Sequence, residues 1–351
     1  MIDKIGKRWR ESVDKVREYE VIKERRIETG FIPSFILDTE YQKAQSLKQR
    51  LLRNYNGKSL EEVIKGEELK TKKGTCYHLL DYYGVNLAKI DRDDLRKKVI
   101  SDLKLIYGIG EVTEQILKEE GYKTIEDLVE HPRFGNDAKK FLEVLDRCDI
   151  SGVIDWISRW YPKSHPLVLY ASGFHDIEDF LFLDIETMGL FLRPIILFGI
   201  ARISGEKISI TQYLVRDIQE EPPALVATFS HLEGDVALVT FNGRTFDIPY
   251  MRERAVYYRM KADFEKLNVD LLYFARRAWK ERVPNCRLST IEKYLIGHER
   301  KDDVPSALVP EFYETYLRTK NPGPLIPIIE HNKQDLVTLA NIFSKLWEEW
   351  R

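Results

Sequence analysis

Residues 180–190, FLFLDIETMGL, place two carboxylates at the end of an apolar run, and this combination limits how the chain can fold. A lone buried carboxylate destabilises a fold by several kcal/mol unless it is paired or binds a cation. Side chains two residues apart on a strand share a face, so Asp184 and Glu186 can reach one cation. The strand must therefore end in water or beside a positive charge.

The pattern of apolar residues changes at about residue 170. Residues 1–99 predict an α+β region to which we assign no function, and residues 100–160 predict a helical segment. From residue 170, three consecutive apolar strands precede alternating helices and strands, and the last third is mostly helical. This order predicts an α/β domain over 170–351, a mixed sheet flanked by helices.

Composition restricts the class of protein further. The 351 residues are 43% hydrophobic, which is enough for a sizeable core, and the net charge of −2 does not indicate a cationic coat for nucleic acid. Cys76, Cys148 and Cys286 are far apart, which argues against a zinc site and suits free thiols in a reducing compartment. The first residues are charged throughout and no apolar run has the length of a membrane span. We therefore expect a cytoplasmic protein without membrane contact.

Two further segments place acidic residues where they can join the first pair. Asp247 begins an expected helix just after a strand that ends at Asn242, and Asp335 lies one helical turn after His331. Each feature alone has an ordinary structural explanation, such as a helix cap for Asp247. Together, acids from three distant segments at one end of a sheet suit two hard divalent cations. Two such cations can promote phosphodiester hydrolysis, and His331 can accept the proton of the attacking water.

These segments resemble the motifs of the DnaQ-like, or DEDD, 3′–5′ exonuclease superfamily, whose fold is ribonuclease H-like. FLDIETMGL is similar to the first motif, FNGRTFDIPYM to the second and HNKQDLVTL to the third, over about residues 170–351. The resemblance implies Mg²⁺ or Mn²⁺ as cofactor, as two ions. It also implies a general base at His331 and four metal ligands, at Asp184, Glu186, Asp247 and Asp335.

The last part of the chain resembles more specifically the YprB-like group of prokaryotic predicted exonucleases. Asp302 and Asp303 lie in a segment typical of that group, and their sequence context indicates either a loop cap or a contact. One spacing departs from the superfamily. Its His subclass places His five residues before the last Asp and its Tyr subclass places Tyr four before, whereas His331 stands four residues before Asp335.

Residues 106–128, IYGIGEVTEQILKEEGYKTIEDL, resemble a helix-hairpin-helix. In that motif a Gly-Ile-Gly turn presents backbone N–H groups to a DNA phosphate. The turn here consists of Gly108, Ile109 and Gly110. Because Glu111 and Glu114 replace residues that are usual in the motif, a structural helical hairpin is the alternative to a DNA contact.

The leading hypothesis is a two-metal nuclease, a 3′–5′ exonuclease with nucleic acid as partner and DNA favoured over RNA. Asn242 and Phe246 lie beside the expected site and are candidates for contacting the terminal nucleotide, although core packing is the simpler role for Phe246. One alternative is a non-catalytic nucleic-acid-binding or adaptor protein. Another is a structure-selective endonuclease or ribonuclease on the same fold.

Overall fold

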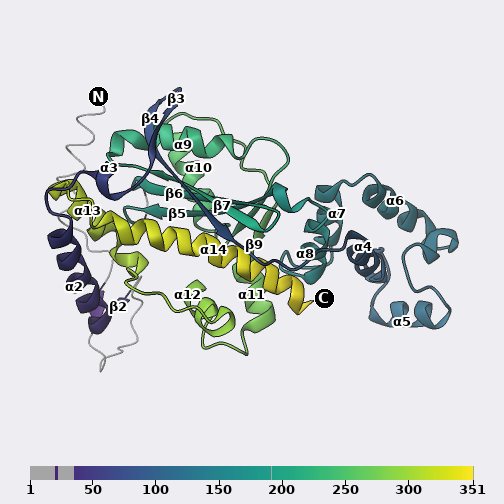
Figure 1. The fold of residues 1–351 in the computed structure, drawn as a ribbon. Helices are drawn as coiled ribbons and strands as arrows, with labels where there is room; N and C mark the ends of the chain where they lie inside the picture. Colours follow the sequence, from purple (N-terminus) through teal and green to yellow (C-terminus); the bar gives the residue numbers. More distant parts are fainter. Residues whose placement is uncertain (1–19, 23–34, 191, 351) are drawn as a thin grey trace.

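The computed structural model describes residues 20–22, 35–190 and 192–350, so most of the predicted region before residue 35 lies outside the described residues. The described chain is built around a seven-stranded sheet with the strand order β3-β4-β7-β6-β5-β8-β9. Helices flank this sheet, and α14 runs across it to the C-terminus (Figure 1). The predicted mixed α/β fold is confirmed.

The centre of the sheet follows the predicted strands. An antiparallel meander consists of β5 (Phe180–Thr187), β6 (Ile195–Ser204) and β7 (Lys207–Leu214). Two short strands, β8 (Ala237–Thr240) and β9 (Asn268–Asp270), extend it in parallel on the other side of β5. Both faces of β5 are covered, which explains its unbroken apolar run, because a strand buried on both sides need not alternate with polar residues.

Residues before position 99 also contribute to this sheet. The hairpin of β3 (Glu67–Thr71) and β4 (Gly74–Gly84) joins it through β4, which pairs antiparallel with β7. The other elements of this region are listed here by their bounds: β1 (Glu20–Ile22), β2 (Phe35–Leu37), α2 (Asp38–Asn54) and α3 (Leu60–Val63). Apolar residues of α2 pack in one cluster with those of α13 (Val309–Thr319). Two strands of residues 1–99 therefore lie in the same sheet as the strands of 170–351.

The helices of the α/β part alternate with its outer strands and then dominate the last third. Before the C-terminal helix they are α9 (Glu221–Ser230), α10 (Asp247–Tyr257), α11 (Leu271–Trp279), α12 (Leu288–Ile291) and α13. The longest, α14 (Leu325–Glu349), packs on β5 and β6 and buries sixteen of its side chains. Short single-turn elements complete this part: η3 (Ile177–Asp179), η4 (Ile218–Glu220), η5 (Glu292–Ile296) and η6 (Ser306–Leu308).

The segment between the hairpin and β5 is helical, as predicted. Its elements are α4 (Arg92–Ile100), η1 (Leu103–Leu105), α5 (Glu111–Glu119), η2 (Asp127–Glu130), α6 (Gly135–Asp146), α7 (Ile150–Ile157) and α8 (Pro166–Ser172). Within this predicted helical segment, residues 123–131 form no α-helix and contain only the 3₁₀ turn η2. There the Asp127 carboxylate accepts hydrogen bonds from the backbone N–H groups of Lys123 and Thr124, a local alternative to helical hydrogen bonding.

The helical segment is attached to the C-terminal end of α14. The Lys98 ammonium and the Tyr170 hydroxyl both donate to the Trp350 carbonyl, at 2.7 and 2.6 Å. Gly173 lies so close to Trp347 that an added Cβ would stand 2.5 Å from the indole ring. Among the helices in the described residues, none combines the length and the apolar character needed to cross a membrane.

Candidate carboxylate site

Strand β5 and the start of α10 bring three carboxylates together. Asp184 and Glu186 occupy alternate positions of β5, opposite Gly199 and Leu197 of β6, and so project to the same side of the sheet. Asp247 is the first residue of α10, and its Oδ1 accepts a hydrogen bond of 3.2 Å from the Ile185 N–H, between the two acids of the strand. Asp247 and Glu186 are buried, and Asp184 keeps partial exposure.

Helix α14 adds His331 and Asp335 to this group. The Nε2 atom of His331 lies 3.5 Å from Asp335 Oδ2, one turn along the helix, and 3.9 Å from Glu186 Oε1. Glu186, His331 and Asp335 are all buried, and each offers a ligand atom within 4.8 Å of the other two. The structure thus brings together all five residues that the sequence predicted as metal ligands and base.

Burial and mutual repulsion perturb the acids of this cluster. Burial, together with the charges of Asp335 and Asp247, raises the pKa of Glu186 to about 8 despite the opposing charge of His331. Burial also raises the pKa of Asp247 to about 7. The pKa of Asp184 lies well above its usual value, first because of burial and then because of Asp335, Asp247 and Glu186. For these three carboxyl groups, burial and repulsion thus outweigh the stabilising effect of the positive charge nearby.

His331 is held in place by an acid outside the predicted set. Its Nδ1 lies 2.6 Å from Asp303 Oδ1, so that Nε2 faces Glu186 and Asp335. Burial lowers the pKa of His331, but the Asp335 charge, the Asp303 hydrogen bond and the Glu186 charge outweigh it and raise the pKa to about 10. Burial raises the pKa of Asp303, but the hydrogen bond with His331 and the charges of His331 and Arg300 together lower it below its usual value. In the absence of another cation, the imidazolium supplies positive charge to the cluster.

Arg300 is the second internal cation. Its guanidinium contacts Asp335 Oδ1 through Nη2 and Glu292 Oε2 through Nε, the latter at 2.5 Å. Its Nη1 lies 3.8 Å from Asp303 Oδ2. Because Arg300 takes Oδ1 of Asp335, the other oxygen is left facing His331. Arg300 thereby fixes both the orientation of Asp335 and the loop that carries Asp303.

Asn332, the neighbour of His331, orients Asp184. Its Nδ2 donates to the Asp184 backbone carbonyl at 3.2 Å and to Asp184 Oδ2 at 2.7 Å. Its Oδ1 accepts from Gln212 Nε2 at 2.8 Å. Room for this amide exists because residue 199 is glycine, where a Cβ would stand 2.1 Å from Asn332 Oδ1.

Sequence reasoning did not identify these supporting residues. Asn332 is inside the quoted third motif, three residues before Asp335, and that helical spacing is the signal that could have found it. Asp303 was noticed only as part of a family-typical segment, without a role. Arg300 and Glu292 precede it, and only the fold of residues 292–304 brings them to α14.

The other predicted contact residues lie outside the carboxylate cluster. Asn242 has φ +68° in the turn before α10, where its N–H donates to Asp270 Oδ1 at 2.8 Å. The half-buried Phe246 ring lies 5.4 Å from the Tyr250 ring and packs against the core. Gly108, Ile109 and Gly110 form the turn between η1 and α5, and the Ile109 side chain is buried in the core.

The Glu114 side chain explains how an acid is accommodated behind this turn. Its Oε1 accepts from the Leu103 N–H at 3.2 Å and from Lys118 Nζ at 2.8 Å, and Lys104 Nζ lies 3.5 Å from Oε2. The carboxylate is thus directed inward and its charge is balanced. Its role in the structure is to join η1 to α5.

The donor set of the cluster fits hard divalent cations. Six carboxylates lie in the cluster or pair with its cations, and they are those of Asp184, Glu186, Asp247, Glu292, Asp303 and Asp335. Within the described part of the chain, their ion pairs come from two cations, Arg300 and His331. Four negative charges remain when all six acids are ionised, and carboxylate oxygens are the ligands that Mg²⁺ and Mn²⁺ prefer.

Comparison with known proteins agrees with this architecture. Residues 181–347 match the family model described as the RNase_H superfamily. The chain is 30% identical over 194 residues to "Uncharacterized protein YprB" of Bacillus subtilis (strain 168), over 53% of this chain and 46% of that protein. It therefore spans about half the length of this relative.

A solved structure of a family B DNA polymerase, from the hyperthermophilic archaeon Pyrobaculum calidifontis, is also similar to part of the chain. The likeness has a TM-score of 0.32 and 17% sequence identity, over 47% of this chain and 27% of the polymerase. The seven-stranded mixed sheet flanked by helices is a ribonuclease H-like α/β fold, and residues 181–347 are similar to the RNase_H superfamily.

Proposed function

We propose that this chain is a two-metal nuclease, a 3′–5′ exonuclease whose catalytic part is residues 170–351. The observation that carries this proposal is the charge balance of the cluster: six acids share two cations, Arg300 and His331, so that four negative charges remain once all six acids are ionised. Two divalent cations neutralise that charge. A purely structural network has no need of such an excess, because each uncompensated buried acid destabilises the fold.

Asp184, Glu186, Asp247 and Asp335 are the proposed cation ligands. Mg²⁺ or Mn²⁺, when bound, supplies a polarised water and stabilises the leaving oxygen of the phosphodiester. The chain's own residues hold the ligands in position before any cation arrives. Asn332 fixes Asp184, the Ile185 N–H fixes Asp247, and Arg300 fixes Asp335.

His331 is the proposed general base, and Asp303 is its positioning partner. A carboxylate can only accept, so the 2.6 Å contact requires that His331 Nδ1–H donates to Asp303. Bound cations displace the second proton of the imidazolium, which stands on Nε2. The bond to Asp303 keeps the remaining proton on Nδ1, so the lone pair of Nε2 faces the cluster. Nε2 is then the atom that accepts the proton of the attacking water.

The proposal is tested with end-labelled single- and double-stranded DNA and RNA, with Mg²⁺, with Mn²⁺ and with a chelator. We expect a ladder that shortens from the 3′ end, dependent on the divalent cation. The Asp184→Asn protein is the matched control, since it keeps the side-chain shape and removes one ligand charge. Its rate is expected to fall by more than about 100-fold, the loss typical of outer-shell substitutions.

The same assay separates the alternatives. Internal cuts would indicate an endonuclease on the same site, and shortening from the 5′ end would reverse the polarity. Absence of cleavage under every metal, together with retained binding, would identify a non-catalytic nucleic-acid-binding protein. Cleavage that survives in Asp184→Asn would contradict the proposed site.

A further inference from the structure

A groove of about 480 Å³ opens on the helical segment, away from the carboxylate cluster. It lies where η1 and the chain after it meet α6 and the end of α7. The residues that line it are Leu105, Tyr107, Asp137, Lys140, Trp156, Arg159 and Trp160. Three of these seven residues are aromatic and two are cationic, a combination that none of the assignments above accounts for.

The aromatic residues present flat faces to solvent. Tyr107 is 73% exposed and Trp160 is 43% exposed, and their ring centroids are 6.0 Å apart. Trp156 is half-buried behind them, where its Nε1–H donates to the Leu105 carbonyl at 2.8 Å and its ring meets Phe141 edge to face. The fold thus fixes one ring as a floor and leaves two neighbouring rings uncovered, although aromatic side chains of this size gain free energy from burial.

Positive charge lies beside these rings. The Arg159 guanidinium stacks over the Trp156 ring at 4.6 Å, and Arg133 stacks over Phe134 at 5.0 Å with Nη2 3.6 Å from where a Cβ of Gly108 would stand. Neither guanidinium forms an ion pair with any residue that the structure describes. The acid of the groove, Asp137, is paired with Lys140 at 3.2 Å. Two arginines are therefore available to an anionic ligand.

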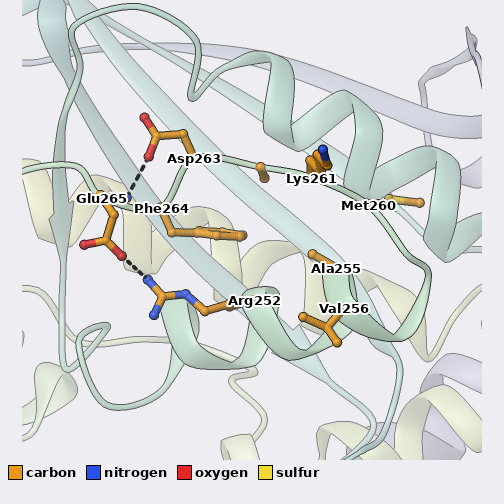
Figure 2. Close-up of a pocket in the computed structure, with 9 residues that line it drawn as sticks. Arg252, Ala255, Val256, Met260, Lys261, Asp263, Phe264 and Glu265 are labelled. Carbon is orange, nitrogen blue, oxygen red and sulfur yellow. Dashed lines mark hydrogen bonds and ion pairs between the residues drawn. The ribbon is translucent and has the colours of Figure 1, made fainter.

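A second hollow, on α10, shows the opposite arrangement. It has a volume of about 400 Å³, and Figure 2 shows its Arg252 directed at Glu265, with which it forms an ion pair of 2.9 Å. Asp263 accepts from the Glu265 N–H at 2.9 Å, and Phe264, the one aromatic lining residue, is 8% exposed. With its arginine paired and its one ring covered, this hollow offers no exposed aromatic face for stacking.

We propose that the groove on the helical segment binds single-stranded nucleic acid, with bases on Tyr107 and Trp160 and phosphates at Arg159 and Arg133. Exposed rings stack on bases of any sequence, and basic groups beside them follow the phosphodiester backbone. A duplex hides its base faces, so the uncovered rings select an unpaired strand. An apolar peptide would not require the two arginines.

The position of the groove indicates which part of the strand it holds, and this step rests on the proposed function. The helical segment contacts Trp347 and Trp350, at the far end of α14 from His331 and Asp335. About 20 Å of helix separates Asp335 from that end, and Figure 1 shows α5 and α6 beyond it. At the stacked rise of about 3.4 Å, this part of the distance alone corresponds to about six nucleotides. The groove therefore retains the strand several nucleotides from the bond that is cut.

The test measures binding of fluorescent oligonucleotides to the full chain in a chelator, so that it does not depend on hydrolysis. Strands of dT and of U, at 4 and 16 nucleotides, are compared with a 16-base-pair duplex. The 16-mers are expected to bind at least tenfold more tightly than the 4-mers, and the single strand more tightly than the duplex. Comparison of dT with U tests whether the groove prefers a DNA strand or an RNA strand.

Variants assign the binding to the groove. Tyr107→Ala and Trp160→Ala are each expected to weaken binding of the 16-mer roughly 5- to 150-fold, equivalent to about 1–3 kcal/mol. Arg159→Gln is expected to reduce the slope of log affinity against log salt by about one. Tyr82→Ala, an equally exposed ring on β4, and Arg147→Gln, an exposed arginine of the same segment, are the matched controls.

Three results would overturn the proposal: unchanged affinity in the Tyr107→Ala/Trp160→Ala double variant, equal losses in the Tyr82→Ala control, or duplex binding as tight as single-strand binding. The mutated rings are exposed, so unchanged circular dichroism is the check on folding. Hydrolysis is scored separately. A protein that binds through the groove but never cleaves would contradict the proposed function alone, and one that cleaves while both ring variants bind normally would contradict the groove alone.

Discussion

Two groups of buried acidic side chains lie in the same domain, and the positive charge that balances each group comes from a different source. Glu221, at the start of α9, is fully buried, and both of its oxygens are occupied. Oε1 accepts from Arg254 Nε at 2.7 Å and from the Ile195 N–H at 3.0 Å. Oε2 accepts from Arg254 Nη2 at 2.6 Å and from the Tyr258 hydroxyl at 2.7 Å. The chain itself closes this site.

The strand-end acids are arranged differently. Arg300 and His331 balance part of their charge, and burial and repulsion raise the pKa of Asp184, Glu186 and Asp247. An arginine equivalent to Arg254 does not accompany them among the described residues. The difference teaches that a buried acid with its own bidentate cation is part of the scaffold, whereas a group of acids short of cations is a site for ions from solution.

Removal of charge is expected to have opposite consequences for stability in the two groups. Glu221→Gln leaves the 4%-exposed Arg254 side chain as an uncompensated buried cation, so we expect a loss of about 3–5 kcal/mol in the free energy of unfolding. Asp184→Asn relieves repulsion, so we expect unchanged or increased stability in a chelator. Urea unfolding of both variants measures this contrast. A loss in Asp184→Asn as large as that in Glu221→Gln would remove the distinction.

Divalent cations are expected to act on only one of the two groups. Mg²⁺ binds the folded cluster and not the unfolded chain, so it should stabilise the protein by about 2.7 kcal/mol at 100 times its Kd. Glu221→Gln should retain this increment, although its starting stability is lower. Asp184→Asn should lose most of it. An equal increment in all three proteins would mean that the cation binds elsewhere.

The stabilisation of the folded protein by Mg²⁺ is also expected to increase with pH. In the cation-free fold the pKa of Glu186 is raised from 4.5 to about 8 and that of His331 from 6.5 to about 10. A raised pKa means that the folded protein holds protons that the unfolded chain has released, so stability without Mg²⁺ should fall between about pH 7 and 8.5. Mg²⁺ displaces those protons, so its benefit should be larger at the higher pH. Chemical unfolding at both pH values measures it, and a smaller increment at the higher pH would contradict the sign.

The sequence was sufficient for the parts of the site that depend on local periodicity. The apolar run of β5 predicted a buried strand, its period placed Asp184 and Glu186 on one face, and the four-residue spacing placed His331 above Asp335. The mixed sheet followed from the order of strands and helices. These inferences succeed because each depends on residues a few positions apart.

The remaining contacts depend on pairings that local sequence does not encode. β4 joins β7 across a long stretch of chain, so the sequence suggested a separate N-terminal region rather than two more strands of the same sheet. Arg300 and Asp303 lie in an irregular loop whose path decides their partners. The sequence of an apolar strand does not explain why residue 199 is glycine. The explanation is the close approach of the Asn332 amide, which only the fold reveals.

Gly199→Ala tests how closely the scaffold holds the cluster. An added Cβ would stand 2.1 Å from Asn332 Oδ1, so the amide must move away from Asp184 or from Gln212. We expect a loss of roughly 1–3 kcal/mol in stability, typical of overpacking, together with a lower rate of hydrolysis. Gly84→Ala is the control, because its Cβ would meet nothing within 4 Å. Similar behaviour of the two variants would show that Asn332 does not constrain Asp184.

The smallest expected effect concerns two adjacent acids, of which one belongs to the surface scaffold and the other contacts the carboxylate cluster. Asp302 is 66% exposed at its side chain and pairs with Arg50 on the surface at 2.7 Å, whereas Asp303 accepts from His331. Asp303→Asn removes the charge that holds the imidazole in its tautomer, so we expect a 10- to 100-fold lower rate with Mg²⁺ binding retained. Asp302→Asn should change stability by less than about 1 kcal/mol and leave the rate unchanged.

The readout is the pH–rate profile of the Mg²⁺-loaded protein, in which only Asp303→Asn should shift the limb assigned to His331. Equal rates for the two variants, or an unshifted profile in Asp303→Asn, would make Asp303 a loop cap and leave His331 without a positioning partner.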